Sequence, residues 1–299
     1  MLSLQQTLED QKNLDALCAS RPNPSRDIFA PNGHYGMADV YKTYAGLPVT
    51  AQLLGIVPHG VELDPKRLWH EERCSKAKCV YCYPELRRDV YGRVAKKQVI
   101  MAASPFLYVK EMFKEEPNSD RKGTILLPVH STDHIMVKQD YERLATILIE
   151  LPDIYHPVSV CLYWKDYMSG AGNAFARRGI PIVSAGHIYD REFLYRMYHL
   201  LSQARFATSN GLGSHLYYAV AAGCSYFNID VGYSWDAPGP VLQRDCSLVS
   251  TFVYQKDMKR IFDKRVPVPT AEQLRVVNYC LSAGQVKTRE GLKNDLLVA

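Results

Sequence analysis

The chain has no long apolar run. Its most apolar stretches, such as TILLPV and ATILIEL, have the length of one strand or one short helix, whereas a membrane-spanning helix needs about 18 consecutive apolar residues or more. The first residues, MLSLQQTLEDQK, are polar and partly acidic, unlike a secretory signal, which starts basic and turns apolar. We therefore expect a cytoplasmic protein, with at most a peripheral contact at the inner face of the membrane.

A strong net charge is also missing. The 36 Lys and Arg residues exceed the 31 Asp and Glu residues by only five, an excess that suits anionic ligands without requiring nucleic acid. The two basic clusters, LRRDVYGRVAKK and KRIFDKR, are interrupted by Asp. We interpret both as solvated surface faces, with weak attraction to an anionic leaflet as the second reading, and we expect no nucleic-acid partner.

Internal repeats, coiled-coil heptads and low-complexity tracts are absent from the 299 residues. Short apolar runs alternate with helix-period segments, the pattern of parallel strands with crossover helices, so the expected fold class is α/β. The polar stretch EEPNSDRKG (115–123) predicts a boundary between an N-terminal domain, residues 1–118, and a C-terminal domain, residues 119–299. Strands are predicted in the first half at DIFAP, QLLGIV, KCVYCY and KQVIMAA, and in the second at GTILLPV, PVSVCLYW, IPIVSA and RFATSN.

The segment ATSNGLGSHLYYAVAAGCSYFNID (207–230) reads as a strand end, a turn, a helix and another strand. A helix N-terminus has unpaired N–H groups and a partial positive charge, so this turn could hold a phosphate. The candidate donor-binding residues are Ser209, Asn210, Gly211, Gly213 and Ser214. The segment is neither a P-loop nor a GxGxxG motif, and a plain turn with a helix cap explains it about as well.

A second loop, LLPVHSTDH, places His130, Ser131 and Thr132 after the first expected strand of the second domain. Ligands of open parallel sheets bind beyond the carboxyl ends of the strands, so both loops could reach one crevice. A helix cap and an ordinary loop histidine are the alternative for this loop alone. Two such loops on one sheet favour a binding site.

The segments PVHSTDH, VCLYWKD, IPIVSAGHIYDREFLYRMYHLL and ATSNGLGSHLYYAVAAGCS resemble the C-terminal domain of GT-B-fold glycosyltransferases of bacterial capsule and surface-polysaccharide synthesis, including the polysialyl and capsular transferases. NGHYG, VPHG and SPFLYV resemble the acceptor domain of that family more loosely. The resemblance implies two Rossmann-like domains whose parallel sheets face a central cleft. It implies a nucleotide-sugar donor bound by the second domain and a polysaccharide or lipid-linked glycan acceptor in the cleft.

Such a transferase needs stabilisation of the leaving phosphate and a base for the acceptor hydroxyl. Helix dipoles, backbone amides and His or Ser side chains can stabilise the phosphate, so we expect no metal and no other cofactor. The favoured base is His59, in VPHG, with His34, in NGHYG, and Asp39, one helical turn further, as the other candidates. A loop histidine held by backbone groups remains an equal alternative for each imidazole.

Eight cysteines without an export signal favour reduced thiols over disulfides. Cys74, Cys79 and Cys82 have the spacing C-x4-C-x2-C, which could hold zinc with His70 as a fourth ligand, or an iron–sulfur cluster with a distant cysteine. Two alternatives to the transferase therefore stand. One is a metal- or cluster-binding protein centred on these cysteines, and the other is a noncatalytic glycan- or nucleic-acid-binding module that uses some of the 20 tyrosines.

Overall fold

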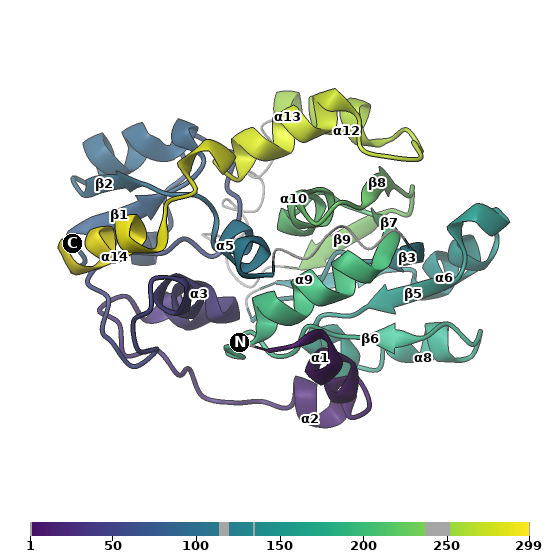
Figure 1. Ribbon diagram of the computed structural model, residues 1–299. Helices are drawn as coiled ribbons and strands as arrows, with labels where there is room; N and C mark the ends of the chain where they lie inside the picture. Colours follow the sequence, from purple (N-terminus) through teal and green to yellow (C-terminus); the bar gives the residue numbers. More distant parts are fainter. Residues whose placement is uncertain (1, 114–119, 134, 237–251, 299) are drawn as a thin grey trace.

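The computed structural model describes residues 2–113, 120–133, 135–236 and 252–298, and it is an α/β protein (Figure 1). The larger sheet has five parallel strands in the order β6-β5-β3-β7-β8. In chain order this is 3-2-1-4-5, a Rossmann-like order in which the direction of winding reverses between β3 and β7. The strands are β3 (Lys122–Leu126), β5 (Val158–Cys161), β6 (Ile182–Val183), β7 (Ala204–Ser209) and β8 (Ser225–Asn228).

Helices cover both faces of this sheet, which explains why its strands are nearly continuous apolar runs. Ile125 and Ala207 belong to one core cluster together with α9 (Phe193–Gln203) and α10 (Ser214–Ala221). Their sequence neighbours Leu126 and Phe206 belong to the opposite cluster, with α6 (Tyr141–Ile149) and α8 (Gly172–Ala176). Successive strand residues point to opposite faces, so both clusters draw on the same strands.

A second, smaller sheet lies in the first half of the chain. It consists of the parallel strands β1 (Cys79–Cys82) and β2 (Gln98–Met101), extended by a bridge from Ile56 to Val80. The helices and turns around it are α3 (Met37–Tyr44), α4 (His70–Cys74), the 3-10 turn η2 (Glu85–Arg87), the π-helical turn η3 (Val90–Val94) and α5 (Pro105–Met112).

The strands expected at DIFAP and QLLGIV are wrong, apart from the single bridge at Ile56. Buried side chains take the place of a neighbouring strand there. The Asp27 carboxylate accepts from the Leu53 N–H at 2.9 Å and pairs with Lys42 at 2.8 Å. The Asn32 side chain accepts from the Val57 N–H at 2.8 Å. Because side chains satisfy these backbone groups, no strand ladder is needed.

Helices from each end of the chain pack against the part of the fold that is built around the other sheet (Figure 1). At the N-terminus, α1 (Leu4–Asp10) packs against α9, and α2 (Leu14–Cys18) packs against α7 (Trp164–Met168). At the other end, α12 (Phe252–Phe262) and α13 (Ala271–Cys280) lie over the larger sheet, and α14 (Arg289–Val298) packs against α3. Most of the predicted linker EEPNSDRKG, including the boundary at 118, lies outside the described residues.

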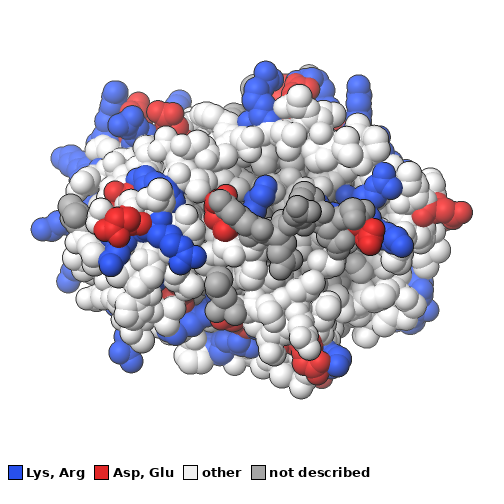
Figure 2. All heavy atoms as spheres, in the orientation of Figure 1, with Lys and Arg blue, Asp and Glu red and all other residues white. Residues whose placement is uncertain are grey.

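The sequence did not predict a two-stranded antiparallel sheet, β4 (Met136–Gln139) with β9 (Tyr233–Asp236). In the part of the chain that the structure describes, no helix combines the length and apolar character that spanning a membrane requires. Basic and acidic side chains are interspersed around the face in Figure 2. Several residues of the two basic clusters form ion pairs, among them Arg88 with Glu85, Arg93 with Asp89 and Arg260 with Glu272.

Candidate functional site

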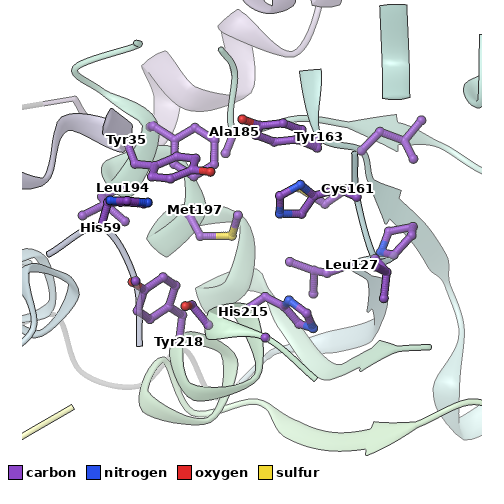
Figure 3. A pocket seen from close by; sticks show the side chains of 18 of the residues that line it. Tyr35, His59, Leu127, Cys161, Tyr163, Ala185, Leu194, Met197, His215 and Tyr218 are labelled. Carbon is purple, nitrogen blue, oxygen red and sulfur yellow. The ribbon is translucent and has the colours of Figure 1, made fainter. Parts of the chain in front are cut away.

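A cavity of about 280 Å³ opens beside the carboxyl ends of β3, β5 and β7 (Figure 3). The first half of the chain contributes Tyr35, His59 and Gly60 to its wall, and the larger sheet contributes the segments that follow its strands. The cavity therefore lies between the two sheets, at the reversal of strand order between β3 and β7, where open α/β sheets bind ligands. The lining from the larger sheet includes Leu127–His130, Cys161–Tyr163, Ala185 and Leu212–His215.

The turn between β7 and α10 is built largely by its own side chains. The buried Ser209 hydroxyl accepts from the Gly211 N–H at 3.2 Å. The Asn210 side chain accepts from the Val129 N–H at 3.1 Å and donates to Gln139 at 2.8 Å. Ser209, Asn210 and Gly211 thus shape the two loops, and they are not among the residues that line the cavity.

Gly213 and Ser214, at the start of α10, do line the cavity. A Cβ on Gly213 would lie 2.9 Å from the ring of His215, so the turn is too tight for a side chain there. The Ser214 hydroxyl accepts from the Val61 N–H at 2.9 Å, which ties the N-terminus of α10 to the first half of the chain. The helix end carries a partial positive charge next to the cavity.

In the loop after β3, only His130 of the three predicted residues lines the cavity. Its ring packs against Tyr163 at a tilt of 35°, with centroids 4.2 Å apart, and its Nδ1 lies 3.0 Å from the Ser131 carbonyl. Because a carbonyl only accepts, Nδ1 carries the proton and Nε2 is an acceptor in the neutral ring. The Ser131 hydroxyl instead accepts from the N–H of Val137 in β4, and the Thr132 hydroxyl accepts from the N–H of Ile135.

Two candidate bases lie against one another at the other wall. The rings of His34 and His59 meet edge to face, with centroids 4.9 Å apart. Burial lowers the pKa of His59, and burial together with the neighbouring His59 lowers the pKa of His34 to about 4. Both imidazoles are therefore neutral near pH 7. His59 lines the cavity, and His34 lies behind it.

Asp39, the third candidate, lies outside the cavity lining. Its carboxylate pairs with Arg191 at 3.2 Å and with Lys42 at 3.6 Å. Burial raises the pKa of this carboxyl, and the two cations oppose that rise. These ion pairs tie Asp39, in the first turn of α3, to Lys42 of the same helix and to Arg191 in the segment before α9, outside the lining of the cavity.

The aromatic wall of the cavity was missed by sequence reasoning. Tyr35, Tyr163, Phe193 and Tyr218 line it, and Tyr35 contacts Phe193 at a centroid distance of 4.8 Å. Tyr35 adopts a left-handed φ of 57°, an uncommon conformation for a residue with a Cβ. Burial raises the pKa of the three tyrosine hydroxyls, so they stay protonated. The only signal was the position of Tyr35 inside NGHYG.

His215 is a further lining residue; it belongs to the same turn segment but was not among the predicted donor-binding residues. Its Nε2 lies 3.2 Å from the Gly211 carbonyl, and burial with the nearby His130 lowers its pKa to about 4. Among the described residues that line the cavity, none is Lys, Arg, Asp or Glu. The described lining of the cavity thus carries no carboxylate, ammonium or guanidinium group, aromatic rings form part of its wall, and it reaches a helix N-terminus, so it suits an apolar ring face joined to an anionic group.

The three cysteines of the alternative metal centre do not lie together. Cys79 and Cys82 are buried in different core clusters, on opposite faces of β1, and Cys74 is exposed with its Sγ 3.6 Å from Nε2 of His70. Among the described residues, no group of three or more His, Cys, Asp or Glu side chains is arranged to hold a metal ion.

Comparison of the chain with family models, with curated proteins and with solved structures finds no match. Functional inference therefore rests on the geometry of the site.

Proposed function

We propose that the protein is a glycosyltransferase that moves a sugar from a nucleotide-sugar donor to a polysaccharide or lipid-linked glycan acceptor, without a metal. The observation that carries this proposal is the cavity itself. It lies at the strand-order reversal of the larger sheet, reaches the N-terminus of α10, and has His59, from the first half of the chain, in its wall. A candidate donor site and a candidate base thus lie in one cavity.

The donor phosphates would lie at the start of α10, close to Gly213 and Ser214. The Ser214 oxygen accepts from Val61, and its hydroxyl hydrogen is then available for a phosphate oxygen. His130 can stabilise the leaving phosphate only when its ring is protonated, since the neutral ring uses its N–H on the Ser131 carbonyl. Tyr163 and Tyr35 offer aromatic faces for the sugar or the base of the donor.

In the transfer step, the bond from the anomeric carbon to the phosphate oxygen breaks and a bond to the acceptor oxygen forms. The acceptor proton passes to His59, whose lowered pKa keeps the imidazole neutral and able to accept it. His34 touches His59 and would orient its ring.

The test is a ligand screen followed by turnover. Nucleoside diphosphates should raise the melting temperature of the purified protein more than the matching nucleosides do, because a ligand at 100 times its Kd stabilises the native state by about 2.7 kcal/mol. Release of nucleoside diphosphate from one nucleotide sugar in the presence of a glycan acceptor should follow. If no nucleoside diphosphate shifts the melting temperature, the proposal is wrong. If a nucleoside diphosphate binds but no sugar is transferred, the protein is a binding module and not a transferase.

A further inference from the structure

A second, smaller cavity of about 170 Å³ adjoins the first. Both cavities are lined by His59, Gly60 and Ser214, so they meet at the candidate base. The rest of the second wall comes from the first half of the chain, including Trp69 and Tyr83. A molecule in the second cavity would therefore approach His59 from the side away from the larger sheet.

Arg87 lines this second cavity and is among the largest fully buried side chains, with 1% of its surface exposed. One guanidinium nitrogen, Nη1, donates to the Asp64 carbonyl. Nε and Nη2 are buried and have no hydrogen-bond partner within the described part of the chain. Two buried guanidinium nitrogens without a hydrogen-bond partner are costly, so an anion that accepts from both would be stabilised at this position.

Two carboxylates, Glu72 and Glu62, line the same cavity. Glu72 accepts from the Tyr91 hydroxyl at 2.9 Å, and the Tyr91 ring lies 5.1 Å from the guanidinium. Burial raises the pKa of the Glu72 carboxyl, and the Tyr91 hydroxyl and the charge of Arg87 oppose that rise. Glu62 pairs with Arg67 at 3.5 Å. No ion pair within 4.0 Å reaches Arg87 from the described residues.

Arg87 also corrects an interpretation of the sequence. The cluster LRRDVYGRVAKK was read as a solvated face, and Arg88 fits that reading with 59% of its side chain exposed. Arg87, its immediate neighbour, points into the protein instead. The turn η2 thus places one arginine in solvent and one in the cavity, which makes Arg88 a matched control for Arg87.

We propose that the cavity around Arg87 binds an anionic group, a carboxylate or a phosphate, on the acceptor. The name acceptor rests on the proposed transferase function, whereas anion binding does not. A guanidinium fork matches either anion through two parallel hydrogen bonds, and such charge-assisted bonds favour an acidic ligand strongly over its neutral analogue. The protein would thereby select acidic glycans and hold the acidic residue next to His59.

The experiment is calorimetric titration with three sugars at equal ionic strength: methyl glucuronide for the carboxylate, glucose 6-phosphate for the phosphate, and methyl glucoside as the neutral analogue. Titrations are run with and without saturating nucleoside diphosphate. We expect one acidic sugar to bind about tenfold more tightly than the glucoside, or better, in both conditions. Arg87→Met should remove this preference, and Arg88→Met should keep it.

Equal binding of the three sugars by the wild type, or a preference that survives Arg87→Met, would overturn the proposal. If Arg87→Met does not fold, Val61→Phe replaces it, because this change fills the cavity and keeps the Val61 N–H that bonds Ser214. Val61→Phe must then weaken binding of the acidic sugar. If the acidic sugar binds more tightly than the glucoside but no nucleotide binds, the transferase proposal alone is wrong. If a nucleotide binds but the acidic sugar is not preferred, the proposed anion site at Arg87 alone is wrong.

Discussion

Burial fixes the charge of the imidazoles around the main cavity. His34, His59 and His215 all have lowered pKa values, and desolvation is the largest cause for each. Neutral rings suit a site that must accept a proton from a hydroxyl group, because a protonated ring cannot do so. The neutral state of these three imidazoles follows from their burial in the fold.

His59→Gln should lower turnover about 10²- to 10⁴-fold and leave nucleotide affinity unchanged, because an amide cannot accept the acceptor proton and His59 would not contact the donor phosphates. Steady-state kinetics and calorimetry with the same nucleotide measure the two effects. His70→Gln, at an exposed position, is the control for an arbitrary histidine. Full activity of His59→Gln with an inactive His34→Gln would transfer the role to His34.

The same burial makes stability depend on pH. The pKa values of His34 and His215 are about 4 in the folded state against an ordinary 6.5, so between these values the unfolded chain binds more protons. The free energy of unfolding should therefore fall as the pH drops from about 6.5 to 4, by up to about 1.4 kcal/mol per pH unit for each histidine. Urea titrations at several pH values should show a shallower fall in His215→Gln. An identical slope in that variant would refute the assignment.

Among the elements, the strands of the larger sheet and both strands of the smaller sheet, β1 and β2, were predictable from the sequence, whereas the strands expected at DIFAP and QLLGIV do not form. β3, β5 and β7 are buried on both faces, and their apolar runs stand out in the sequence. β4 and β9 have no such run, since Met136 is 64% and Trp235 is 38% exposed. DIFAP is apolar enough for a strand, but Asp27 inside it bonds a distant backbone group, a contact that no local pattern reveals.

The same limit applies to the site. His59, His130, Gly213 and Ser214 could be found because they follow apolar runs at the expected edge of a sheet. The tyrosines of the wall could not, because most of the largest buried side chains in this protein are aromatic and nothing local separates a cavity tyrosine from a core one. Arg87 was hidden by the charged residues around it, since only the turn decides which arginine faces inward.

The turn before α10 supplies the prediction at this scale. Gly213→Ala should weaken nucleoside diphosphate binding about tenfold or more, because the new Cβ would meet the His215 ring at 2.9 Å and displace the turn from the phosphate. Gly284→Ala is the matched control, since a Cβ there has no heavy atom within 4 Å. Calorimetric titration of both variants gives the comparison. Wild-type affinity in Gly213→Ala would remove this turn from the donor site.

At the scale of the whole molecule, the two sheets are joined by segments that cross between them. The Ser214–Val61 hydrogen bond closes the contact at the cavity. At the far end, the Tyr44 hydroxyl donates to the Lys287 carbonyl at 3.0 Å, and α14 packs beside it on α3. We therefore expect the geometry between His59 and α10 to depend also on α14.

Leu292 tests this dependence because it is fully buried in α14, while Leu297 in the same helix is 63% exposed. Leu292→Ala should lower the free energy of unfolding by about 2–5 kcal/mol through lost burial and the cavity it leaves, and Leu297→Ala by less than about 0.5 kcal/mol. The informative reporter is Trp164 beside the larger sheet, isolated by Trp69→Phe and Trp235→Phe. Since the crossing segments couple the sheets, Leu292→Ala should shift the urea midpoint of Trp164 fluorescence as far as that of circular dichroism. An unchanged urea midpoint of Trp164 fluorescence would mean that the larger sheet unfolds independently of α14. Contacts other than those of α14 would then have to hold His59 in position relative to α10.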